Sequence, residues 1–64
     1  MNPIRRYEKI MEVLLTQKEV TVAQLSESLG VTGKTIREDL AKLEQQGLLV
    51  RVHGGAVLAQ SDQY

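Results

Sequence analysis

Residues 21–55 read TVAQLSESLGVTGKTIREDLAKLEQQGLLVRVHGG and hold the clearest structural pattern of the chain. A first helical pattern spans residues 22–29, where apolar residues recur at the spacing of one helix face. Gly30 ends it, because glycine readily adopts the positive φ of a helix C-terminus. Thr32 then caps a second helical pattern over residues 33–46. The stretch therefore predicts two helices joined by a tight turn.

The second of these helices has two distinct faces. Its core face repeats at i, i+4 and i+7, with Ile36, Leu40 and Leu43. At 100° per residue the opposite face carries Lys34, Glu38, Ala41 and Gln45, with Arg37 on one flank and Lys42 on the other. This polar face is predicted to stay exposed.

Two short β-like runs follow the second helix, which Gly47 stops. Residues 48–52 predict a strand and residues 56–58 a return strand. His53, Gly54 and Gly55 lie between them as a turn, since two glycines between β-like runs are a hairpin signal.

Upstream of residue 21, the pattern predicts a further helix that ends near Gln17, with Pro3 either in its first turn or just before it. Its apolar stripe is wide enough to be covered from more than one side, and consists of Ile4, Tyr7, Ile10, Met11, Val13, Leu14 and Leu15. Residues 18–21 read as an extended segment and one strand of a small sheet. Thr21 is the predicted N-cap of the next helix, with Gln24 at the capping-box position.

Together these elements predict a winged helix-turn-helix over residues 1–58, mainly α, with three helices and a small antiparallel hairpin or three-stranded sheet. Such an arrangement presents one helix as a rod that fits the major groove of double-stranded DNA. The sequence therefore favours double-stranded DNA as the partner.

Length and composition narrow the alternatives. The chain has 64 residues, no cysteine and one histidine, so we expect one small domain without a disulfide, a metal site or a cofactor. No apolar run approaches the roughly 20 residues of a membrane span, and no apolar segment follows the N-terminal basic pair as a signal peptide would require. We expect a cytoplasmic protein without membrane contact. The formal net charge of +0 is low for a small DNA-binding domain.

Three segments resemble the N-terminal DNA-binding domain of the DeoR family of bacterial transcriptional regulators. They are Arg5 or Arg6 near the start, VTVAQLSESLGVTGKTIREDL over residues 20–40, and LLVRVHGGAV over residues 48–57. The pair TIR-x-DL and R-x-HGGA is more specific than a helix-turn-helix alone. Family members are usually repressors of sugar or nucleoside catabolism operons, and their C-terminal domain binds a phosphorylated sugar and drives oligomerisation.

The resemblance implies that this chain reads an operator for a repressor, and we expect the operon to serve sugar catabolism. The C-terminal effector domain is absent from this sequence, so residues 59–64 are expected to begin the linker to it. The full-length protein is expected to be a homo-oligomer on paired half-sites about 34 Å, or a multiple of it, apart.

We expect DNA contacts from three parts of the chain. The candidates in and beside the exposed helix are Thr32, Gly33, Lys34, Thr35, Arg37, Glu38 and Lys42, those in the hairpin are Arg51, His53, Gly54 and Gly55, and those at the N-terminus are Arg5 and Arg6. Hydroxyls and a helix N-terminus suit phosphate, and an arginine fork suits phosphate or a guanine edge.

Simpler roles stand beside these expectations. The two hairpin glycines shape the turn, the N-terminal arginines are equally well an exposed basic pair, and Asp39 is expected to pair with Arg51 or another basic side chain. The family often reads TIRRDL, whereas this chain has Glu38 at the second arginine. A carboxylate there either accepts a hydrogen bond from cytosine N4 or weakens DNA binding.

An enzyme is excluded by inventory, because the chain lacks a nucleophile with its base and orienting group, a phosphate loop and a metal-binding spacing. The rival interpretation is a winged-helix module that binds another protein and no DNA. Salt dependence separates the two, because DNA binding releases condensed counterions.

Overall fold

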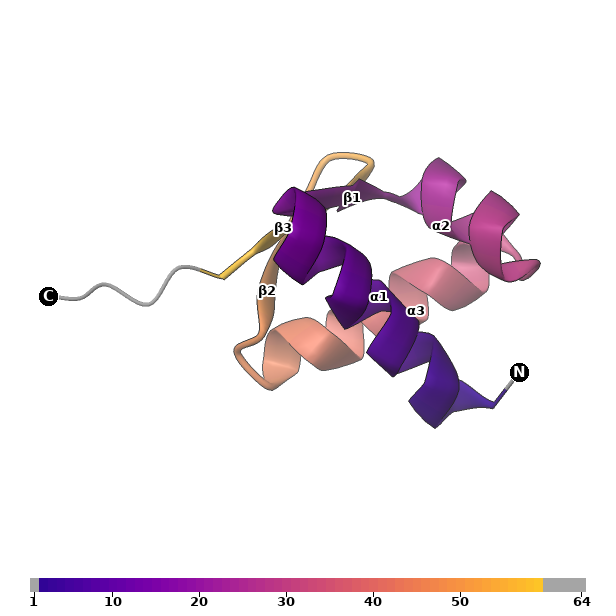
Figure 1. Cartoon of the computed structure of the whole chain (residues 1–64), viewed down its shortest axis with the longest axis horizontal. Coiled ribbons are helices and arrows are strands. Elements are labelled where there is room, and N and C mark those ends of the chain that lie inside the picture. The colour runs from indigo at the N-terminus through magenta and orange to yellow at the C-terminus, as the bar shows by residue number, and fades with distance from the viewer. Residues whose placement is uncertain (1, 60–64) are drawn as a thin grey trace, which may run out of the picture.

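The computed structural model describes residues 2–59 and contains three helices and one antiparallel sheet (Figure 1). The elements follow the order α1 (Pro3–Gln17), β1 (Glu19–Thr21), α2 (Val22–Leu29), α3 (Gly33–Gln45), β2 (Leu49–Val52) and β3 (Gly55–Leu58). The sheet has the strand order β1-β3-β2. This is the predicted winged helix-turn-helix. Residues 60–64 of the predicted linker lie outside the described residues.

Each helix begins at a polar side chain that accepts a hydrogen bond from the first turn. The caps are Asn2, Thr21 and Thr32, which accept from the backbone N–H of Arg5, Gln24 and Thr35. The predicted threonine caps are therefore confirmed. They satisfy backbone donors that have no partner within the helix.

Two glycines end α2 and α3 as predicted, with φ of 70° at Gly30 and 79° at Gly47. After α3, Leu48 N–H donates to Leu43 O and Gly47 N–H donates to Glu44 O, which is a Schellman motif. Because Leu48 is used in this motif, β2 starts at Leu49 and not at the predicted residue 48. The helix itself ends at Gln45, one residue earlier than predicted.

Gly55 belongs to β3, so the hairpin turn is His53 and Gly54 alone. In the register, Gly55 faces Thr21 of β1 and Val52 of β2. A Cβ on Gly55 would lie 3.0 Å from Thr21 Cα and closer still to the carbonyl oxygen of Val20. Glycine at this position lets β1 and β3 approach each other.

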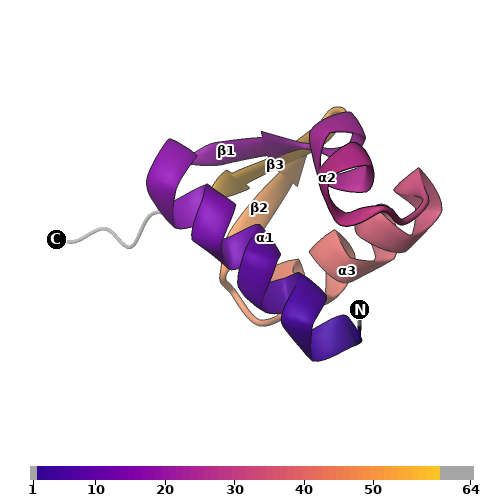
Figure 2. The same ribbon diagram turned by 45° about the vertical axis from the view of Figure 1, so that its right-hand side comes forward.

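The core is aliphatic and receives side chains from every element. Its buried apolar members are Ile10, Leu14, Val20, Leu25, Ile36, Leu40, Leu43, Leu49 and Ala56. The predicted core face of α3 is confirmed. The stripe on α1 packs against the core along most of its width, whereas Ile4 and Leu15 are 64% and 58% exposed. This helix contacts both α3 and the sheet, through β1 and β3 (Figure 2).

Candidate nucleic-acid interface

The side of α3 opposite its buried face is polar and exposed. Ile36, Leu40 and Leu43 anchor the helix in the core, so residues on the far side are held away from it. Lys34, Glu38 and Lys42 are all exposed there. The Glu38 side chain has no ion pair or hydrogen bond within residues 2–59, unlike those of the other two acids of α3.

The start of α3 is occupied by its own cap. Thr32 Oγ1 accepts from Thr35 N–H at 3.2 Å and lies 3.1 Å from the Thr35 hydroxyl. A Cβ on Gly33 would lie 3.3 Å from Val22 Cγ1 of α2, so Gly33 also provides close contact between the two helices. Both threonines and Gly33 remain candidate DNA contacts. Each also has a structural role, in the helix cap or in the contact between α2 and α3.

A groove separates α3 from the β2–β3 hairpin. It is lined by Val22, Arg37, Leu40, Glu44, Arg51, Val52, His53, Gly54 and Gly55. The hairpin tip is held in place because Val22 N–H donates to Gly54 O at 2.9 Å. The fold thus brings Arg37, Arg51 and His53 to one groove, although they come from two separate elements.

Glu44 of α3 holds Arg51 of the hairpin at this groove. Its Oε2 accepts from the Arg51 backbone N–H at 2.9 Å, and its Oε1 accepts from Arg51 Nε at 3.0 Å. These bonds, the backbone one first, lower the pKa of the Glu44 carboxyl below its ordinary value. Glu44 is not among the site residues predicted from the sequence. A usable signal was its position seven residues after Arg37, on the same flank of the helix.

The two N-terminal arginines lie in different environments. Arg5 is exposed. Arg6 donates from Nε to Asp39 Oδ2 at 2.6 Å and from Nη2 to Asp39 Oδ1 at 3.1 Å. The side chains of Arg6 and Asp39 are only 14% and 3% exposed. Asp39 therefore pairs with Arg6 and not with Arg51, and the hydrogen bond raises the pKa of Arg6 above its ordinary value.

Of the predicted contacts, Gly55 is buried and Arg6 is half-buried in its ion pair. Lys34, Arg37, Glu38, Lys42, Arg51, His53 and Gly54 are exposed. Within the described part of the chain no cluster of His, Asp or Glu could hold a metal ion. No helix of residues 2–59 is long and apolar enough to cross a membrane.

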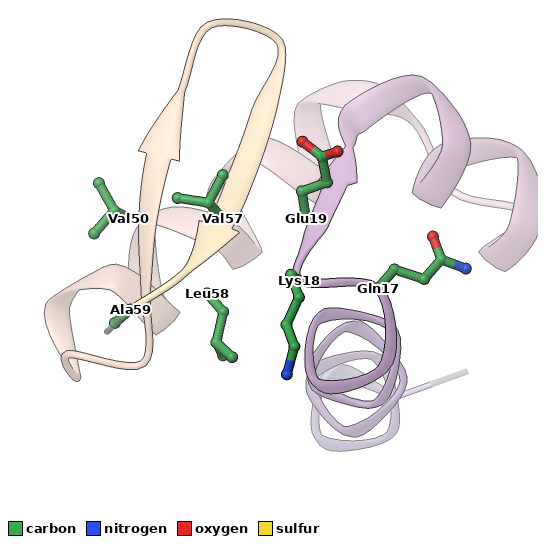
Figure 3. A pocket seen from close by; sticks show the side chains of 7 residues that line it. All are labelled: Gln17, Lys18, Glu19, Val50, Val57, Leu58 and Ala59. Atoms are coloured by element: carbon green, nitrogen blue, oxygen red, sulfur yellow. The ribbon is translucent and has the colours of Figure 1, made fainter. Parts of the chain in front are cut away.

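A second hollow lies on the outer side of the sheet, lined by Gln17, Lys18, Glu19, Val50, Val57, Leu58 and Ala59 (Figure 3). Glu19, Val57 and Val50 are paired across the three strands. Successive strand residues point to opposite faces, so this row lies on the face away from buried Val20 and Ala56. The hollow is separate from the groove beside α3.

Comparison with known proteins identifies the family. The DeoR-like helix-turn-helix domain matches residues 6–62. The chain is 44% identical over 63 residues to the HTH-type transcriptional regulator GolR of Listeria innocua, covering 98% of this chain and 25% of that protein. It is 43% identical over 61 residues to the lactose phosphotransferase system repressor of Lactococcus lactis, covering 95% and 24%.

The putative aga operon transcriptional repressor of Escherichia coli O157:H7 is 48% identical over 56 residues, covering 88% of this chain and 21% of that protein. No solved structure gives a significant match. The chain spans about a quarter of the length of the first of these curated relatives. It belongs to the DeoR family of helix-turn-helix transcription regulators, whose helix-turn-helix domain binds DNA.

Proposed function

We propose that this DeoR-family chain reads an operator in double-stranded DNA for a repressor of a sugar-catabolism operon. The observation that carries the proposal is the exposed face of α3 beside a groove that holds Arg37 and Arg51. The printed names of relatives, a lactose phosphotransferase system repressor and an aga operon repressor, support the sugar operon.

In this mechanism α3 enters the major groove of the DNA. The DNA backbone then lies along the protein groove between α3 and the hairpin. Lys34, Arg37, Lys42 and Arg51 supply contacts to phosphate, which provide affinity without sequence information. Specificity comes from the exposed residues among positions 33–41, which face the base edges. His53 and Gly54 at the hairpin tip are placed to contact backbone or minor groove. Arg5 stays a candidate backbone contact.

The remaining parts of the proposal concern the whole protein. Residues 1–58 are the DNA-binding domain and residues 59–64 begin a linker to a C-terminal effector domain. That domain binds a phosphorylated sugar and makes the protein a homo-oligomer. The oligomer occupies half-sites about 34 Å, or a multiple of it, apart, because each half-site must present the same face of the duplex.

The test is an NMR amide-shift titration of the 64-residue chain with a generic DNA duplex. We expect shifts confined to residues 32–42, 51–55 and the N-terminal arginines, shrinking as salt rises. Absence of shifts at low salt would overturn DNA binding and favour the protein-interaction module. The net charge of +0 and the two acids paired with Arg6 and Arg51 speak for that rival.

A further inference from the structure

We propose that Glu44 is a positioning residue, which holds the Arg51 guanidinium at the groove so that its two Nη nitrogens face a DNA phosphate. This inference rests on the proposed DNA binding. According to this inference, the negatively charged side chain of Glu44 favours the binding of DNA, although DNA is also negatively charged.

The geometry divides the donors of Arg51 into two sets. Glu44 takes the backbone N–H at 2.9 Å and Nε at 3.0 Å, one with each carboxylate oxygen. Neither Nη nitrogen of Arg51 has a hydrogen-bond partner among residues 2–59. An arginine presents five donors in a rigid planar fork, so fixing Nε fixes the direction of the two free amino groups.

The same contact joins two elements that must act together on DNA. β2 is an edge strand in the order β1-β3-β2, so its outward backbone N–H groups lack a strand partner. Glu44 satisfies one of them from the third helix. The hairpin and α3 are therefore connected at Arg51, whose guanidinium is the cation proposed to contact phosphate. Arg51 loses less side-chain freedom on binding than an untethered arginine would.

Two effects of removing Glu44 have opposite signs, which makes the inference testable. Losing a carboxylate near a phosphate raises the affinity for DNA, because it removes a repulsion between two negative charges. Losing the anchor of Arg51 lowers affinity, because the guanidinium must then be ordered on binding. If positioning is the larger effect, a variant with one fewer negative charge binds DNA more weakly.

The experiment measures binding of a fluorescein-labelled generic DNA duplex to the 64-residue chain and its variants by anisotropy. We expect Glu44→Gln to weaken binding about three- to tenfold, the scale of a partly lost charge-assisted hydrogen bond. In an Arg51→Ala background the same substitution leaves affinity unchanged or raises it. Glu27→Gln removes an exposed acid of α2 as the control for net charge.

Equal or tighter binding by Glu44→Gln in the native background overturns the inference and shows that Glu44 competes with phosphate. An unchanged loss in the Arg51→Ala background overturns it as well. If the parent chain binds no DNA at low salt, the proposed function itself fails. The Arg51 Nε–H resonance of the parent is an independent check, since it should keep its Glu44-bonded shift in the complex.

Discussion

Arg37 is the candidate DNA contact that α3 brings to the groove beside the hairpin. It lines the groove with Arg51 and is exposed. We predict that Arg37→Ala weakens DNA binding by about 1–3 kcal/mol, as expected for loss of a bidentate contact to a base or phosphate. The measurement is a binding isotherm on a duplex selected from a random library. Unchanged affinity would mean that α3 is placed wrongly on the DNA.

At Gly55, the backbone of β1 already occupies the space that a side-chain Cβ would need. Its missing Cβ faces the Val20 carbonyl and Thr21 Cα of β1, and backbone moves less readily than a side chain. We predict that Gly55→Ala destabilises the domain by about 3 kcal/mol, the upper part of the range for overpacking. Chemical denaturation measures this value. Gly54→Ala is a useful comparison, because nothing lies within 4 Å of its Cβ position but its φ is 78°.

At the scale of elements, the ion pair of Arg6 and Asp39 fastens α1 to α3. Removing Arg6 leaves a nearly inaccessible carboxylate without its bidentate partner, which is costly in a folded protein. We predict that Arg6→Ala lowers the melting temperature by several degrees, while Arg5→Ala on the exposed neighbour changes it little. Calorimetry on both variants measures their melting temperatures and tests this prediction. A loss of DNA affinity by Arg6→Ala at unchanged melting temperature would instead make Arg6 a DNA contact.

The contact between α3 and the hairpin should respond to pH. The pKa of Glu44 is lowered from its ordinary 4.5, so its stabilising effect is complete above that pH and is lost as pH falls through the folded-state pKa. We predict that the parent is more stable than Glu44→Gln at neutral pH and that the difference disappears in acid. Urea unfolding of both proteins from pH 7 to about pH 3 measures it. A difference that does not change with pH would mean that Glu44 stabilises by packing alone.

At the scale of the molecule, zero net charge does not prevent salt-dependent binding. Two of the eight basic residues are paired with acids of α3, whereas Lys34, Lys42 and Arg37 have no ion pair within residues 2–59. With Arg51, four contacts predict a slope of about −3.6 for log affinity against log salt. Anisotropy titrations between about 50 and 200 mM salt give the slope. A slope near zero would favour a protein partner.

Much of the fold was predictable because its signals are local. The caps Thr21 and Thr32, the stop at Gly30 and the stop at Gly47 each act within one helical turn. The core face of α3 follows from a repeat inside one element. For the same reason, local sequence signals predict the order of the helices and the hairpin. That order in turn predicts the winged helix-turn-helix.

Tertiary structure alone determined which side chains meet. Arg6 and Asp39 are 33 positions apart, and their pairing depends on how α1 lies on α3. The same is true of the exposed Ile4 and Leu15, since a stripe does not reveal which side will be covered. Whether Arg51 pairs with Asp39 or Glu44 depends on the hairpin closing against the far half of α3. Local sequence signals do not encode such contacts, because they depend on the packing of complete elements.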